Sequence, residues 1–351
     1  MSRSARNNWP KKPRSKTLSA PALRIAFFGT PQVALPTLEA LLGSRHPVVA
    51  VVTQPDRGRG RGRKESPSPV GERALAAGVP LLRPENVGDA ETVETLSGCA
   101  ADLGIVVAFG QFIPRQIRTL PRLGYLINGH ASLLPRYRGA SPIAQAILDG
   151  EEATGVSVMR VERAMDAGPV ALVRRLEIGE RETTGELTER LSALAAEALL
   201  ETVEAIAENQ IEWTEQDDTQ ASVAPKITRA DGLIDWAQGA TRCARQIHAM
   251  APKPGAFTHL PPADGQAAEL KILRAYALPA EPADSPRRGE LRLASEAADP
   301  PIRIGTAEGW LVPLEVQRAG GKTMDPAAFL RGHPLEDQLL LGSGEHKPGT
   351  P

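Results

Sequence analysis

The sequence predicts an α/β domain built on a mostly parallel sheet, followed by a small β-barrel domain. Nearly continuous apolar runs alternate with helix-like segments through the first half of the chain. Many short strand-like segments then follow, with glycine and proline between them, as in small barrels. The length of 351 residues also exceeds the roughly 250–300 residues that one hydrophobic core usually supports. Two domains are therefore expected.

The first strands are predicted at four apolar runs, which are residues 24–29, 46–53, 103–109 and 125–128. Runs that are apolar throughout are typical of parallel strands covered by helices on both faces. After the first run, Thr30 and Pro31 offer an N-cap and a first helical residue, and Pro36 is an alternative helix start.

The end of the first domain is predicted as a hairpin and a long helix. Residues 154–161 and 169–176 are strand-like with no helix between them, which indicates a hairpin with Asp166 in its loop. Leucines and alanines recur at three- and four-residue steps over residues 187–206, the pattern of an amphipathic helix. We expect this domain to span residues 24–207.

The second domain is expected at residues 226–343, after a polar linker at residues 208–225. Its predicted elements are a helix at 239–250, strands at 268–278, 289–294, 302–305 and 310–317, and a short helix from Asp325-Pro326 to Gly332. Residues 344–351 are predicted to fray.

Residues 1–23 carry six Lys or Arg and no acid. Their prolines oppose the amphipathic helix of a transit peptide, so a disordered basic tail or an upstream start codon is expected.

Composition excludes several classes of protein. The net charge of −1 means that any affinity for a polyanion must come from local clusters of charge. The only cysteines, Cys99 and Cys243, are far apart in sequence, which argues against a disulfide framework or a zinc site and favours a reducing compartment. No apolar run approaches the roughly 20 residues of a membrane span. We expect a cytoplasmic monomer that binds no metal.

Three polar residues have no evident structural purpose. The run 125–127 leads directly into Asn128-Gly129-His130, and Asp166 begins an Asp-Ala-Gly sequence. Side chains two apart on a strand share a face, so Asn128 and His130 are predicted to converge. Open α/β sheets bind ligands at the carboxyl ends of their strands. Taken singly, each residue is more often a turn residue or a satisfied histidine than a functional group.

The order of the motifs is more specific than any one of them. Asn-x-His, then Ser132-Leu133-Leu134-Pro135, then Arg138-Gly139, then Asp166-x-Gly resembles the signature of the formyltetrahydrofolate-dependent formyltransferases. The resemblance extends from about Arg24 to Gly332. It implies a Rossmann-like formyltransferase domain with an OB-like barrel behind it. It also implies 10-formyltetrahydrofolate as the donor of a formyl group, with catalytic roles for Asn128, His130 and Asp166.

The chemistry of formyl transfer suits these three side chains. Moving a formyl group to an amine passes through a tetrahedral carbon with an oxyanion, which needs aligned hydrogen-bond donors. Asn128 can donate through its amide and His130 through a ring N–H. Asp166 can orient and charge His130, or steer a water that moves a proton between the two nitrogens. Neither a nucleophilic side chain nor a metal is required.

The folate site is expected around the same strand ends. By position in the family, Ser132, Leu133, Leu134 and Pro135 border the pterin and the reaction centre, the alternative being an ordinary apolar loop. Phe109 and Gly110 lie at the end of a neighbouring strand, and backbone groups there suit a planar pterin.

A basic segment indicates the formyl acceptor. Residues 54–69 resemble the basic loop of those family members that formylate methionyl-initiator-tRNA for translation initiation. Cations between glycines can follow phosphates, and an arginine can also stack on a base. The residues predicted to contact tRNA, with Arg61 the leading candidate, are Arg57, Arg59, Arg61, Arg63 and Lys64. The alternative for this segment is a solvated loop without a ligand.

The sequence leaves other functions open. An amino-sugar nucleotide N-formyltransferase would use the same three residues and the same folate donor. A non-catalytic RNA-binding protein would leave those residues unexplained, and Gly29-Thr30-Pro31 is not the glycine-rich turn of a dehydrogenase.

Three residues depart from the family pattern. Gly129 replaces a bulkier residue and should loosen the strand, Lys253 replaces a tryptophan, and Ala167 is the residue found in sugar-modifying relatives.

Overall fold

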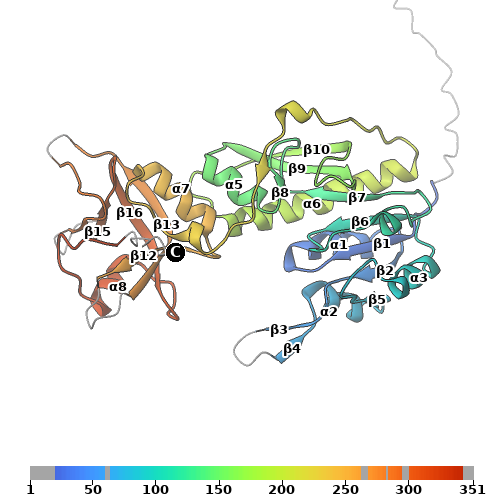
Figure 1. Ribbon diagram of the computed structural model, residues 1–351, viewed down its shortest axis with the longest axis horizontal. Helices are drawn as coiled ribbons and strands as arrows, with labels where there is room; N and C mark the ends of the chain where they lie inside the picture. The colour runs from blue at the N-terminus through green and yellow to red at the C-terminus, as the bar shows by residue number, and fades with distance from the viewer. Residues whose placement is uncertain (1–19, 60–63, 262–267, 282–283, 295–299, 343–351) are drawn as a thin grey trace, which may run out of the picture.

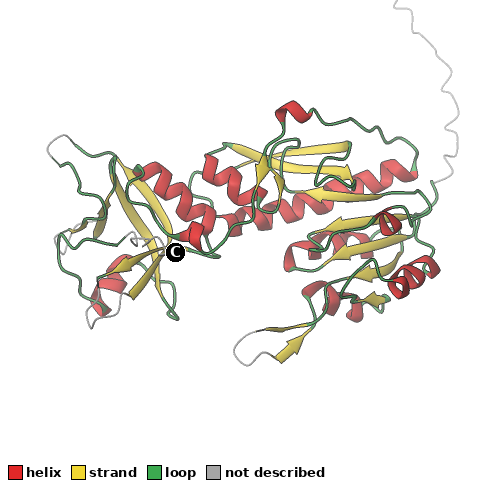
Figure 2. Ribbon diagram, in the orientation of Figure 1, coloured by secondary structure: helices red, strands yellow, loops and turns green. Residues whose placement is uncertain are grey.

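The computed structural model describes residues 20–59, 64–261, 268–281, 284–294 and 300–342, and it contains an α/β domain and a β domain. Figures 1 and 2 show the two domains side by side, with the long helix α6 (Thr184–Ala207) reaching from the first toward the second. Most of the predicted tail at 1–23 and all of the predicted tail at 344–351 lie outside the described residues.

The first domain contains a seven-stranded sheet in the order β10-β9-β7-β6-β1-β2-β5. Its strands are β1 (Ile25–Gly29), β2 (Val48–Val52), β5 (Leu81–Leu82), β6 (Leu103–Val107), β7 (Leu126–His130), β9 (Ala153–Arg160) and β10 (Val170–Glu177). The first five run parallel, and β9 and β10 are antiparallel. The four predicted strands and the predicted hairpin are confirmed, with Asp166 in the loop between β9 and β10.

Helices cover both faces of this sheet. Helices α1 (Leu35–Leu42), α2 (Pro69–Ala76), α5 (Pro142–Asp149) and α6 (Thr184–Ala207) pack on one face, and α3 (Ala90–Gly98) and α4 (Arg115–Arg118) on the other. The predicted long helix is α6, which opens with a capping box of Thr183 and Glu186.

The prediction that Thr30 caps the first helix is wrong, and the alternative prediction that this helix starts at Pro36 is correct. Helix α1 begins at Leu35 with Pro36 in its first turn, after a single 3₁₀ turn at Gln32–Ala34. Proline lacks an N–H, which an α-helix does not need in its first turn. The Thr30 hydroxyl instead donates to the Phe109 carbonyl at 2.9 Å and so connects the ends of β1 and β6.

The second domain is a curled, five-stranded antiparallel sheet in the order β12-β13-β16-β15-β14. Its elements are α7 (Ala240–Met250), β12 (Ala256–Leu260), β13 (Ala268–Leu278), β14 (Leu291–Leu293), β15 (Ile302–Gly305), β16 (Trp310–Arg318) and α8 (Pro326–Gly332). Single bridges join His259 to Gly342 and Glu290 to Leu340. The chain after α8 therefore connects the two edges of the sheet, which makes the domain barrel-like and protects its edges.

The two domains meet beside the start of α6. Arg274 on β13 donates to the Arg181 carbonyl and to Glu186 Oε1, both at 2.7 Å. The Arg274 guanidinium is the main reason that the pKa of Glu186 falls to about 2. Thr184 donates to the Ala249 carbonyl at the end of α7. None of the described helices has both the length and the apolar character needed to cross a membrane.

Gly129 lies where β7 passes under α6. A Cβ atom at this position would stand 3.0 Å from Leu199 Cδ1 and 3.8 Å from the Ala195 Cβ. The strand is not loosened by the glycine, because Gly129 pairs with Val158 of β9 and the neighbouring Asn128 pairs with Val106 of β6. Glycine here allows the helix to approach the strand closely.

We predict that Gly129→Val destabilises the protein through contact with Leu199. Overpacking of this kind costs about 1–3 kcal/mol in the free energy of unfolding. In a Leu199→Ala background the same substitution should cost clearly less, because the clashing methyl group is gone. Urea unfolding of the four proteins measures this coupling. An equal cost of Gly129→Val in both backgrounds would contradict the packing explanation.

Candidate active site

The predicted three residues come together at the carboxyl edge of the parallel sheet. Asn128 and His130 point to the same face of β7, as expected from their spacing, while Gly129 faces α6. Asp166 reaches them from the loop between β9 and β10. All three line one cavity of about 700 Å³.

Both ring nitrogens of His130 face protein oxygens. Nε2 lies 2.8 Å from the Tyr137 carbonyl oxygen, and Nδ1 lies 3.6 Å from Asp166 Oδ2. A carbonyl can only accept, so Nε2 must carry a proton. The separation of 3.6 Å is too long for a hydrogen bond, so Nδ1 is the nitrogen left to serve a substrate. The side chain is 7% exposed, which confines that approach to the cavity.

The Tyr137 carbonyl is a functional group that sequence reasoning missed. Tyr137 has a left-handed backbone (φ 61°), and its N–H donates to Ser222 Oγ at 2.9 Å. Its hydroxyl has Glu151 at 2.9 Å and Asp149 at 3.1 Å as acceptors for its one proton. Burial and these carboxylates raise the pKa of Tyr137, which keeps the hydroxyl protonated and donating. The bonds at both ends of the residue hold its carbonyl toward His130.

Asp166 is held by backbone groups and by a segment predicted as a linker. Its Oδ2 accepts from the Gly139 N–H at 2.8 Å, and its backbone is left-handed (φ 51°). Gln216, from residues 208–225, donates to the carbonyls of Asp166 and Gly168 at 2.9 and 2.7 Å. These contacts fix the loop and leave the carboxylate beside the imidazole.

Asn128 differs from its two neighbours because its side chain is available. Within the described part of the chain, its amide makes no hydrogen bond to another group, although it lines the cavity. A half-buried amide without a protein partner can donate to a ligand at little cost, since no existing bond has to break.

The predicted folate residues divide into two groups. Phe109 and Gly110 line the cavity at the end of β6, and Gly110 has a left-handed backbone (φ 84°). Residues 132–135 are not among the described residues that line it. Instead, the Ser132 hydroxyl donates to the Arg136 carbonyl at 2.6 Å, and the Leu134 N–H donates to Ser157 at 3.1 Å. The structure thus places these residues as a brace for the loop that carries Tyr137.

The cavity is also bounded by residues that the motifs did not indicate. Thr184, Thr188 and Ser192 line it from α6, and Ile227 and Lys253 line it from the C-terminal side. Their positions depend on the meeting of two distant segments, which leaves no local sequence signal.

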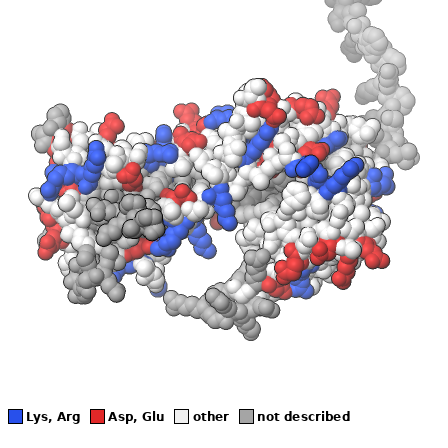
Figure 3. Space-filling model, in the orientation of Figure 1, with Lys and Arg blue, Asp and Glu red and all other residues white. Residues whose placement is uncertain are grey.

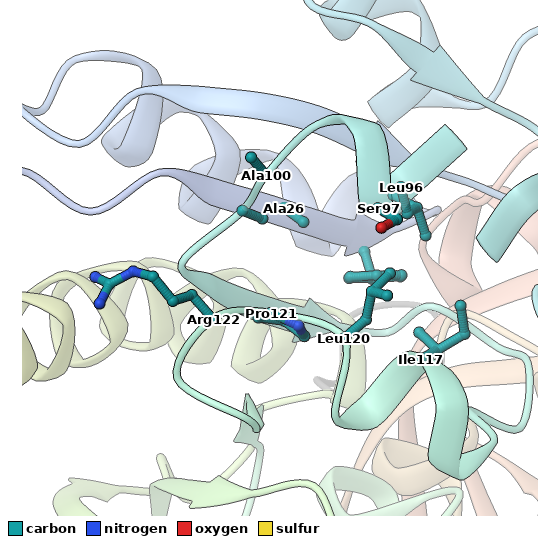
Figure 4. A pocket seen from close by; sticks show the side chains of 10 residues that line it. Ala26, Leu96, Ser97, Ala100, Ile117, Leu120, Pro121 and Arg122 are labelled. Carbon is teal, nitrogen blue, oxygen red and sulfur yellow. The ribbon is translucent and has the colours of Figure 1, made fainter. Parts of the chain in front are cut away.

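A second, smaller cavity of about 180 Å³ lies near the amino ends of the strands, away from the three polar residues. Figure 4 shows that Leu96, Ile117 and Leu120 surround it, while the Arg122 side chain extends away. Its lining is almost wholly apolar and contains no acid–base pair, so we assign it no chemistry.

The basic segment forms a hairpin that projects from the first domain (Figure 1). Arg57 and Arg59 lie on β3 (Arg57–Arg59), and Lys64 lies on β4 (Lys64–Ser66). Arg61 and Arg63 fall outside the described residues. Among the described residues, no cluster of His, Cys, Asp and Glu side chains is arranged to hold a metal ion.

Two family models match most of the chain. The formyl transferase model matches residues 23–203, and the model of the formyl transferase C-terminal domain matches residues 226–334. A methionyl-tRNA formyltransferase of Solibacter usitatus is 40% identical over 322 residues, which cover 92% of this chain and 99% of the relative. A methionyl-tRNA formyltransferase of Pelobacter propionicus is 41% identical over 318 residues, which cover 91% of this chain and 96% of the relative.

Two solved structures share the fold at low identity. HypX from Aquifex aeolicus in complex with tetrahydrofolic acid gives a TM-score of 0.59 at 18% identity over 90% of this chain. The match covers 49% of HypX, so this chain spans about half of that protein's length. The N-formyltransferase from Helicobacter canadensis, in complex with folinic acid and dTDP-3-aminofucose, gives a TM-score of 0.58 at 16% identity. The match covers 85% of this chain and 100% of that protein.

The family follows from the two models and from relatives that are about 40% identical over nine tenths of the chain. The motif order predicted from the sequence agrees with it. This chain is a formyltransferase and belongs to the methionyl-tRNA formyltransferase family.

Proposed function

We propose that this enzyme transfers the formyl group of 10-formyltetrahydrofolate to the amino group of methionine esterified to initiator tRNA. The observation that supports this most is the single cavity that contains the Asn128 amide, His130 Nδ1 and the Asp166 carboxylate. The reaction occurs where charged tRNA is used, so we propose a cytoplasmic enzyme that acts as a monomer.

The proposed reaction forms one carbon–nitrogen bond and breaks another. The neutral amine attacks the formyl carbon, and the formyl oxygen becomes an oxyanion. The Asn128 amide and a proton on His130 Nδ1 then donate to that oxygen. As the intermediate collapses, the bond between the formyl carbon and folate nitrogen breaks. The incoming nitrogen loses a proton and the departing nitrogen gains one, with Asp166 beside both to carry or direct it.

Asp166 has a second proposed role toward His130. Nδ1 lies 3.6 Å from Asp166 Oδ2 and both side chains are largely buried, so a proton on Nδ1 would be attracted to the carboxylate. The carboxylate would thereby favour the form of the ring that donates to the oxyanion. Tyr137 keeps the other nitrogen occupied, so the proton can be offered only toward the cavity.

For the donor, we propose that the pterin binds against the backbone at Phe109 and Gly110. Residues 106–111 line the cavity at the end of β6, and a planar pterin suits a wall of this kind. Contacts of Ser132, Leu133, Leu134 and Pro135 with folate stay a prediction from family position.

For the acceptor, we propose that the β3–β4 hairpin and the connecting residues 60–63 contact tRNA. The cations assigned to this contact are Arg57, Arg59, Arg61, Arg63 and Lys64. Such a basic segment would be of little use to an enzyme acting on an amino-sugar nucleotide, which is the competing acceptor.

Asn128→Ala should lower kcat by about 100- to 1,000-fold, because one oxyanion donor is removed. Single-turnover formylation of methionyl-tRNA with saturating donor measures this, with circular dichroism to check folding. Asn86→Ala, at an exposed position outside the residues that line the cavity, is the matched control and should retain activity. Unchanged transfer by a folded Asn128 variant would remove this residue from the mechanism.

Arg61→Gln should weaken binding of methionyl-tRNA and flatten its dependence on salt. Removing one ionic bond to a phosphate reduces the slope of log affinity against log salt by about 0.7–0.9. Binding is measured across a salt series, with formyl transfer to an amino-sugar nucleotide assayed in parallel. If the sugar nucleotide were the better acceptor, or if tRNA binding were unchanged, the assignment of this segment would be wrong.

A further inference from the structure

Lys253 brings a positive charge into the cavity from the second domain. Among the described residues that line the cavity, the charged ones are Asp166 and Lys253. Lys253 is exposed, and within the described part of the chain its ammonium group makes no hydrogen bond or ion pair. Most lysines in a protein either form an ion pair with a neighbouring carboxylate or extend into solvent far from any cavity. Lys253 does neither.

The backbone turn that carries Lys253 is held by hydrogen bonds, whereas the Lys253 side chain makes no hydrogen bond or ion pair to the described residues. The Gly255 N–H donates to the Met250 carbonyl at 2.9 Å, and Lys271 Nζ donates to the Pro254 carbonyl at 2.7 Å. Pro252 and Pro254 on either side restrict the backbone further. The backbone position from which Lys253 lines the cavity is thus fixed by the fold.

Neighbouring arginines at the domain junction form ion pairs or hydrogen bonds with other groups of the protein. Arg274 pairs with Glu186 and Glu315, and Arg242 donates to the Leu148 carbonyl. Among the described cations at this junction, Lys253 lines the cavity and is left for a ligand.

We infer, on the basis of the proposed function, that Lys253 binds a phosphodiester of the single-stranded 3′ end of the acceptor RNA. The bound phosphate would place the aminoacyl ester so that its amine enters between Asn128 and Asp166. Lysine is well suited to this because its ammonium group acts as a compact charge toward phosphate oxygens.

The surroundings of Lys253 favour the acceptor over the carboxylates of the folate donor. The proposed pterin contacts, Phe109 and Gly110, belong to the first domain, whereas Lys253 lines the cavity together with Ile227 from the C-terminal side. Ile227 also lines a neighbouring hollow of about 550 Å³, which Lys226 lines as well. A strand could pass Lys226 on its way into the cavity.

The hollow along that route carries charges of both signs. Asp231 and Asp235 line it, and hydrogen bonds from Thr228 and Gln238 respectively lower the pKa of these carboxyls and keep them ionised. Figure 3 shows basic side chains of the second domain on the side that faces the β3–β4 hairpin. An RNA held by the hairpin would therefore meet positive charge across from it.

The test compares Lys253→Gln, Lys253→Arg and the control Lys322→Gln in the full-length enzyme. Lys322 is exposed, outside the residues that line the cavity, and its removal changes the net charge equally. For Lys253→Gln we expect a KM for methionyl-tRNA about two- to fivefold higher, as for a single exposed ionic contact. The salt slope of tRNA binding should fall by about 0.7. Lys253→Arg should keep the wild-type slope, and the KM for the folate donor should not change.

Two results would overturn the inference. A higher KM for the folate donor with an unchanged tRNA salt slope would place Lys253 on the donor's carboxylates. A variant equal to the Lys322 control in every parameter would show that Lys253 contacts neither substrate. Failure of the wild-type enzyme to formylate methionyl-tRNA at all would instead refute the proposed function, so the two failures are distinguishable.

Discussion

The hydrogen bond between His130 Nε2 and the Tyr137 carbonyl, 2.8 Å long, is the constraint on which the active site depends. Because the carbonyl cannot donate, the bond decides which ring nitrogen carries a proton permanently and which one meets the substrate. The side chain of Asp166 lies beside that second nitrogen and is itself positioned by the Gly139 N–H. The chemistry therefore rests on two backbone groups from one short loop.

The same loop links the site to the rest of the molecule. Arg138-Gly139 forms a short strand, β8 (Arg138–Gly139), which pairs with β11 (Val223–Ala224). The preceding segment reaches Asp166 through Gln216. Residues between the two domains thus support the catalytic loop, while Thr184 and Lys253 close the cavity from the junction. A change in domain packing would alter the cavity, since Thr184, Ile227 and Lys253 form the side of it that lies at the domain junction.

Much of this structure was predictable from sequence, for physical reasons that are local. Apolar runs identified the parallel strands, and leucine spacing identified α6. The spacing of Asn128 and His130 predicted their shared face. The failures are non-local. Thr30 has the chemistry of a cap, but its hydroxyl is taken by a carbonyl 79 residues away. Tyr137 acts through its backbone, which carries no side-chain signature, and the place of Lys253 in the cavity depends on docking between domains.

Nitrogen-15 NMR of the imidazole of His130 tests the central claim most directly. The six histidines can be labelled together, and the signal of His130 is identified by its loss in His130→Asn. In the neutral ring the proton should be on Nε2, which donates to the Tyr137 carbonyl, and Nδ1 should be bare. A neutral ring with its proton on Nδ1 and a bare Nε2 would contradict the role given to the Tyr137 carbonyl and, with it, the proposed geometry of the oxyanion site.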